Sequence, residues 1–208
     1  KIIAALNENR VEIFLQPIYC LRSNKFTSAE ALVRIRELDG SVILPNEFIP
    51  IAEEARLIKT LGERIFDMSC KFLNKQVKEN LPLDYLEINL SVVQCEQNDL
   101  SKRFIDIIEK YRLPPSMINL EITETASIRT KQRLLENMAQ LISYGSSFSL
   151  DDFGSGQSNL NYIVSMPVAI VKLDMNMTKS YFTEPKAKYV VRAAVRMIHE
   201  IGLSVVAE

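Results

Sequence analysis

The sequence predicts an α/β fold in which β-strands alternate with α-helices around a parallel sheet. Seven short apolar or β-branched runs are spread along the 208 residues, and longer amphipathic segments, with apolar residues three and four positions apart, fill the gaps between them. Seven strands fit two architectures. One is a TIM-like (β/α)8 barrel whose last βα unit is missing from this chain, and the other is an open doubly wound sheet.

The expected elements alternate in a regular order, after a start at residues 1–10 that has the pattern of an amphipathic helix. Strands are expected at Glu12–Ile18, Ala29–Ile35, Tyr85–Leu90, Ile118–Ile122, Ser147–Asp151, Ala169–Asp174 and Leu203–Ala207. Helices are expected at Phe48–Ile58, Leu61–Val77, Asp99–Tyr111, Thr130–Tyr144 and Lys186–Ile201. Proline and glycine residues mark the joins where a helix should stop before a strand, among them Pro114, Gly145 and Gly202.

Length and composition indicate one globular domain over residues 1–208. Hydrophobic residues make up 47% of the chain and charged residues 25%, which is enough apolar material for a core. No run of about 18 or more apolar residues is present, so we expect no membrane contact from this segment and no secretion signal. The chain ends at Glu208 directly after a strand and begins inside a helix, so we expect natural sequence beyond both ends.

Charge, cysteine and histidine content narrow the possible chemistry. The formal net charge is −1 with both signs interspersed, which does not favour binding to a nucleic-acid polymer. Cys20, Cys70 and Cys95 show no CxxC spacing, so we expect reduced thiols in a cytoplasmic protein rather than disulfides or a zinc site. The single histidine, His199, argues against histidine-based catalysis. Any chemistry must therefore depend on carboxylates and metals.

Polar side chains gather at the C-terminal ends of the expected strands. Because side chains alternate along a strand, Glu30 and Arg34 share one face, as do Lys172 and Asp174. If these faces point inward, they line the end of the barrel where enzymes of this fold place their active sites. The residues at or near strand ends are Glu30, Asn89, Glu121, Glu124, Asp151, Asp152, Lys172, Asp174 and Glu208, and the same parity aligns Leu32 with Glu30, Glu87 with Asn89 and Ser149 with Asp151.

Such a ring of acids needs cations, because like charges a few ångströms apart repel one another. Oxygen-only ligands favour Mg²⁺ or Mn²⁺ over zinc, and the adjacent Asp151 and Asp152 suit two ions roughly 3.5 to 4 Å apart. Two such ions activate a water and stabilise an in-line displacement at phosphorus. Lys172 is a candidate for orienting that water, and Glu208 is a candidate proton acceptor.

Each residue also has a purely structural interpretation. A single acid at a strand end is usually a helix cap or a surface charge, Asp152 suits a turn, and Glu124 suits the cap of the next helix. Lys172 suits a structural ion pair with Asp174 or Asp151. The joint pattern favours a functional site, because one inward acid or amide on strand after strand would be costly in a purely structural core.

Seven motifs in order resemble the EAL domain family over essentially the whole chain. They are Gln16-Pro17-Ile18, Glu30-Ala31-Leu32-Val33-Arg34, Pro45 to Glu53, Asn89-Leu90-Ser91, Glu121-Ile122-Thr123-Glu124, Asp151-Asp152-Phe153-Gly154 and Lys172-Leu173-Asp174. The resemblance implies a barrel whose first strand is antiparallel to the rest. It also implies a cytoplasmic signalling phosphodiesterase that opens cyclic di-GMP to linear pGpG with two Mg²⁺ or Mn²⁺ ions.

The resemblance also implies a role for each site residue. Metal ligands would be Glu30, Asn89, Glu121 and Asp151, with Asp152 at the second ion. Lys172 would orient the attacking water, Glu208 would act as ligand or base, and Glu124 would anchor the loop that begins at Asp152. Gln16, Leu32, Arg34 and Asp174 would hold the nucleotide. A homodimer and further signalling domains in the full-length protein are implied as well.

Two other functions fit the same motifs less well. A receptor that binds cyclic di-GMP without cleaving it would be expected to have lost a metal-ligating acid, and every such position here is retained. A pure protein-interaction domain would leave the acids and Arg34 without a purpose. Some neighbouring positions depart from the family, such as Ile35, where an aromatic residue is common. Metal-dependent cleavage separates the hydrolase from both alternatives.

Overall fold

The computed structural model describes the chain except for residues 82, 124–130 and 156–159. Its centre is one eight-stranded sheet in the order β1-β2-β4-β5-β6-β7-β8, with β3 paired to β2. The strands are β1 (Val11–Cys20), β2 (Lys25–Arg36), β3 (Val42–Ile43), β4 (Leu86–Asn89), β5 (Ile118–Thr123), β6 (Ser147–Phe153), β7 (Ile170–Leu173) and β8 (Ser204–Ala207).

Strand direction follows the connections. A short turn joins β1 to β2, and these two strands pair antiparallel, as do β2 and β3. Every later neighbour in the sheet pairs in parallel, with at least one helix in each crossover that the structure describes. The antiparallel first strand is therefore confirmed.

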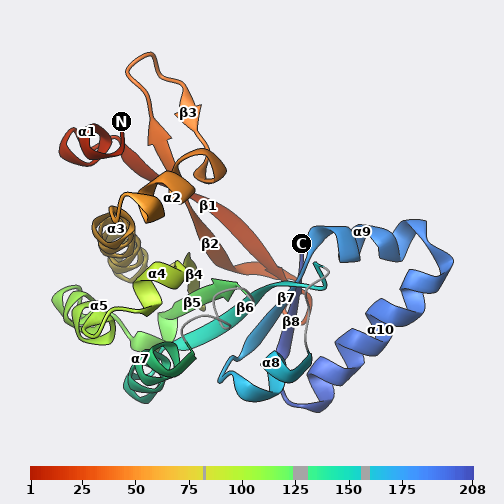
Figure 1. The fold of residues 1–208 in the computed structure, drawn as a ribbon. Coiled ribbons are helices and arrows are strands. Elements are labelled where there is room, and N and C mark those ends of the chain that lie inside the picture. The colour runs from red at the N-terminus through yellow and green to blue at the C-terminus, as the bar shows by residue number, and fades with distance from the viewer. Residues whose placement is uncertain (82, 124–130, 156–159) are drawn as a thin grey trace.

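The helices lie mainly outside the curled sheet. In Figure 1, α3, α5 and α7 stack along one outer side of the sheet, whereas α9 and α10 lie on the opposite side of the molecule, beyond β7 and β8. The α-helices are α1 (Ile2–Asn7), α2 (Pro45–Glu54), α3 (Ile58–Lys78), α4 (Val92–Cys95), α5 (Leu100–Lys110), α7 (Lys131–Tyr144), α8 (Leu160–Ser165), α9 (Met175–Thr183) and α10 (Pro185–Glu200), and a short 3₁₀ turn, η1, spans Pro115–Met117. None of the described helices is both long and apolar enough to cross a membrane.

Strand alternation separates an apolar layer from a polar one. Leu86 and Ile88 of β4 lie in the hydrophobic core together with residues of the outer helices, where Phe66 of α3 stacks on Phe104 of α5 with ring centroids 3.8 Å apart. Glu87 lies between Leu86 and Ile88 in the sequence, so its side chain points to the opposite face, inside the curl. It is nevertheless fully buried. The inside of the curl is therefore a buried polar layer, and it positions the site.

The seven expected strands are all present, with ends that differ by at most four residues. The structure corrects one helix prediction and adds several short elements. The helix expected over Phe48–Ile58 ends at Glu54, because Arg56 adopts a left-handed backbone (φ 57°) before α3 begins. The two-residue β3 and the helices α4, α8 and α9 were not predicted from periodicity, since most of them are too short to show it. The expected start of a helix at Thr130 lies outside the described residues.

Candidate metal centre

Lys172 lies at the centre of a ring of carboxylates. Its Nζ atom lies 2.6 Å from Glu121 Oε1, 2.8 Å from Glu208 Oε1 and 3.2 Å from Glu30 Oε2. Asp151 Oδ1 follows at 3.5 Å and Glu87 Oε2 at 3.9 Å. These residues come from β2, β4, β5, β6, β7 and the chain end directly after β8. One ammonium group therefore faces five carboxylates, which leaves a strong excess of negative charge.

Parallel pairing explains why residues so distant in sequence meet here. Glu30 is in register with Glu87, and Asn89 is in register with Glu121 on the next strand. Partners in register on adjacent strands point to the same face of the sheet. Asn89 also donates a hydrogen bond from Nδ2 to Glu30 Oε1 at 2.8 Å, which orients that carboxylate.

A bulge in β6 brings two consecutive acids to the site. The pairing of β6 with β7 shifts between Leu150 and Phe153, and Asp152 adopts φ 58°. Aspartate tolerates this left-handed conformation better than most residues, and a bulge redirects the side chains around it. In a regular strand, Asp151 and Asp152 would point to opposite faces. Here oxygen atoms of Asp151, Asp152 and Glu208 come within 4.8 Å of one another.

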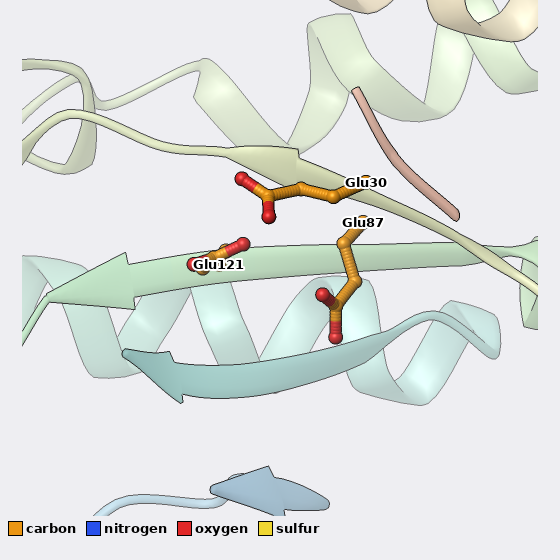
Figure 2. A group of neighbouring side chains, drawn as sticks. All are labelled: Glu30, Glu87 and Glu121. Atoms are coloured by element: carbon orange, nitrogen blue, oxygen red, sulfur yellow. The ribbon is translucent and has the colours of Figure 1, made fainter. Parts of the chain in front are cut away.

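The acids form two groups that differ in burial. Glu30, Glu87 and Glu121, which we call the inner group, are all buried, and one carboxylate oxygen of each lies within 4.8 Å of the other two (Figure 2). Asp151, Asp152 and Glu208, the outer group, are partly or fully exposed. Among the described residues, Glu87 Oε1 and Oε2, Glu121 Oε2 and Asp151 Oδ1 are buried and accept no hydrogen bond. Bare carboxylate oxygens of this kind fit hard divalent cations.

The charge excess changes the proton affinities of the site. Burial raises the pKa of Glu87 to about 7, and Lys172 opposes that rise only in part. Burial, followed by the charges of Asp151 and Glu30, also raises the pKa of Glu121. For Lys172, burial favours the neutral form, but Glu121, Asp151 and Glu30 together outweigh it and raise the pKa above the ordinary value, so the group stays charged.

The residues expected to hold a nucleotide lie on two antiparallel strands and at one helix start. Gln16 of β1 is in register with Glu30 and is exposed, so it shares the face of the acid ring. Arg34 of β2 is partly buried, donates to the carbonyl of Val33 at 2.8 Å, and has its guanidinium carbon 5.7 Å from the centroid of the Phe14 ring. Leu32, in register with Phe14, lies between Glu30 and Arg34 on that face.

Asp174 has a structural task in this arrangement. Its side chain caps α9 by accepting hydrogen bonds from the backbone N–H groups of Asn176 and Met177 at 2.9 and 3.4 Å. Its charge also contributes to the raised pKa of Asp152, for which burial is the largest cause and Asp151 the next. Asp174 therefore lies near the outer group.

The structure thus brings together most of the residues singled out from the sequence. Glu30, Asn89, Glu121, Asp151, Asp152, Lys172 and Glu208 meet at one end of the parallel strands. Glu124 lies outside the described residues. Glu87 is the site residue that sequence reasoning left without a role, although its parity with Asn89 already placed it on the same face. All three cysteines are free, as expected.

These features define an α/β protein with a cluster of acidic side chains at the carboxyl ends of a parallel sheet. The profile of the family described as EAL domain matches residues 1–208, and the chain belongs to that family. The sequence is 33% identical over 204 residues to the signaling protein YkoW of Bacillus subtilis, covering 98% of this chain and 25% of YkoW. It is 29% identical to the cyclic di-GMP phosphodiesterase PA2567 of Pseudomonas aeruginosa, covering 97% of this chain and 34% of that protein.

A solved structure gives the same fold. The complex of the PaMucR phosphodiesterase with c-di-GMP superimposes with a TM-score of 0.91 at 27% identity, covering 99% of this chain and 83% of the other. The sequence is also 28% identical over 204 residues to the bifunctional diguanylate cyclase/cyclic di-GMP phosphodiesterase MucR of Pseudomonas aeruginosa, covering 98% of this chain and 30% of MucR. The chain spans about a quarter to a third of the length of YkoW and PA2567, so these relatives contain much sequence outside the shared domain.

Proposed function

We propose that this chain is a metal-dependent phosphodiesterase that hydrolyses cyclic di-GMP to linear pGpG in bacterial second-messenger signalling. The observation that carries the proposal is the ring of carboxylates around Lys172, with buried oxygens that accept no hydrogen bond from the described residues. Family membership supports it, since relatives in the family are named cyclic di-GMP phosphodiesterases. No metal-ligating position of the family motifs is lost in this chain, which favours the hydrolase over a non-catalytic receptor.

The donor set fits two Mg²⁺ or Mn²⁺ ions. Glu30, Asn89, Glu121 and Asp151 would hold the first ion, and Asp152 would serve the second. When bound, such ions lower the pKa of a coordinated water and stabilise negative charge on a phosphoryl group. Carboxylate and amide oxygens are the ligands that these hard cations prefer, and the structure supplies them without a competing thiol or imidazole among the described residues of the ring.

The remaining side chains would bind the nucleotide and handle protons. Lys172 keeps its charge and would donate a hydrogen bond that orients the attacking water. Glu208, 2.8 Å from Lys172 and partly exposed, would accept the proton released by that water. Arg34 would bind a phosphate oxygen through its guanidinium group. Its hydrogen bond to the Val33 carbonyl is made by Nη1, which leaves Nε and Nη2 to donate to the phosphate. Gln16, Leu32 and Asp174 would contact the rest of the nucleotide.

The wider architecture belongs to the same proposal. We infer a TIM-like barrel, formed by residues 1–208 with one further βα unit. The order β1 to β8 is open at both edges in the described residues, and apolar side chains of α10 such as Tyr189 and Val190 are exposed. A cytoplasmic location, a homodimer and additional signalling domains are also part of the proposal, the last supported by the length of the relatives.

A hydrolysis assay tests the proposed activity. The protein is incubated with cyclic di-GMP and Mn²⁺ or Mg²⁺, and pGpG is followed by chromatography. We expect pGpG to form with the wild-type protein and with Glu136→Gln, an exposed acid on α7, but not with Glu30→Gln or after chelation. Recovery of intact nucleotide from folded, metal-loaded protein would contradict catalysis and favour the receptor.

A further inference from the structure

Glu87 is a buried carboxylate that the proposed mechanism does not use. Its side chain is fully buried, and neither carboxylate oxygen accepts a hydrogen bond from the residues that the structure describes. Its closest cation is Lys172, whose Nζ lies 3.9 Å from Oε2, beyond hydrogen-bonding distance. Such a group is expensive to bury, because a carboxylate loses its hydration without gaining donors.

The neighbouring donors are committed to other acceptors. Asn119, which is in register with Glu87 on β5, donates to Ser147 at 2.9 Å, and the Ser149 hydroxyl donates to Asn119 at 2.7 Å. Asn89 donates to Glu30, and Lys172 donates to Glu121 and Glu30. Within the described part of the chain, no side chain around Glu87 donates a hydrogen bond to it.

The inner group has the oxygen atoms and the charge to hold a cation. One carboxylate oxygen from each of Glu30, Glu87 and Glu121 lies within 4.8 Å of the other two, and the three side chains come from the neighbouring strands β2, β4 and β5 (Figure 2). Three carboxylates opposed by the Lys172 ammonium leave a formal charge of −2, which one divalent ion neutralises. Because this group is buried, its attraction for a cation is screened much less than that of the exposed outer group.

We propose that Glu87 is a direct ligand of a divalent cation held by the inner group. With Glu87 as a ligand, the inner group would bind a metal ion more tightly than the outer group does, in the absence of nucleotide. This inference rests on the proposed function, because it requires that the acid ring holds divalent cations. It adds a second residue from β4 (Leu86–Asn89) to the proposed ligand set, two positions before Asn89.

Isothermal titration calorimetry with Mn²⁺ in the absence of nucleotide tests the inference. Glu87→Gln removes the charge with little change of shape, and Glu87→Asp keeps the charge but withdraws the carboxylate by one methylene. We expect both variants to bind the first Mn²⁺ at least about tenfold more weakly than the wild-type protein, since weakening even an outer contact of a metal site costs about 10- to 100-fold. Glu136→Gln is the matched surface control and should bind as the wild type does.

The outcomes separate the inference from the proposed function. If Glu87→Asp binds Mn²⁺ as the wild type does, Glu87 acts only through its charge and the ligand assignment is overturned. If Glu30→Gln weakens binding while Glu87→Gln does not, the inference falls and the proposed metal site stands. If the folded wild-type protein binds no Mn²⁺, both fall. A larger Mn²⁺-induced rise in Tm for wild type than for Glu87→Gln would support the assignment independently.

Discussion

Replacing Lys172 with methionine should strongly destabilise the metal-free protein. The ammonium group lies between 2.6 and 3.9 Å from oxygens of five carboxylates, and its side chain is 3% exposed. Methionine has a similar length but no charge. Removing one partner of a buried ion pair typically costs about 3–5 kcal/mol, because the other charge is left uncompensated. The acids can take up protons in response, so we expect a loss of about 3 kcal/mol at pH 8 and a smaller loss at pH 5.

Urea unfolding followed by circular dichroism measures this loss, once with a chelator and once with Mn²⁺. Lys110→Met is the matched control, because Lys110 is also 2.6 Å from a carboxylate, that of Asp67, but on the surface. Solvent screening makes that pair weak, so its loss should change stability far less. Mn²⁺ should restore most of the stability lost in Lys172→Met. Equal losses in the two lysine variants, or no recovery with Mn²⁺, would refute the reasoning.

Three further predictions follow from the structure. The pKa of Glu87 is raised from 4.5 to about 7 in the folded protein, so protonation of Glu87 stabilises the fold. This stabilisation, about 3 kcal/mol, is complete below pH 4.5 and should be lost as the pH rises through 7. A free energy of unfolding of the chelated protein that does not change over this pH range would contradict the prediction. Phe66→Ala removes a fully buried ring stacked on Phe104 and should lower the free energy of unfolding by about 3–5 kcal/mol in urea titrations, whereas a loss below about 1 kcal/mol would contradict that packing. Gly154→Ala should lower Tm, because φ at this position is +98°, a backbone conformation that alanine adopts only with strain, and the added Cβ would also press on the Met177 side chain; an unchanged Tm would contradict the left-handed conformation at Gly154.

The parts of the fold that sequence patterns could predict are those with a clear period. The two-residue period of the strands placed Glu30, Asn89, Asp151 and Lys172 on inward faces, and parallel pairing then carried them to a common end of the sheet. The three- and four-residue spacing located the long helices. Both signals extend over enough residues to outweigh local exceptions.

The remaining features depend on single residues or on tertiary contacts. Alternation alone puts Asp151 and Asp152 on opposite faces, and only the bulge at φ 58° brings both to the outer group. Glu87 shows the opposite case, since its parity was visible but its complete burial without a hydrogen-bond donor was not. From its place after a strand, Asp174 fits either a helix cap or a nucleotide-binding residue. The structure shows that its side chain caps α9. The boundary at Arg56 likewise depends on one backbone conformation.

Phosphorus-31 NMR on cyclic di-GMP mixed with the protein and Mn²⁺, quenched with chelator before the spectrum is recorded, tests the central claim most directly. Cyclic di-GMP contains two phosphodiesters, and hydrolysis of one of them leaves one phosphodiester and one phosphomonoester. We predict that the phosphomonoester signal grows until it equals the remaining phosphodiester signal, and that Glu30→Gln prevents it. Two unchanged phosphodiesters, with the nucleotide bound to folded and metal-loaded protein, would contradict the account and identify the domain as a receptor.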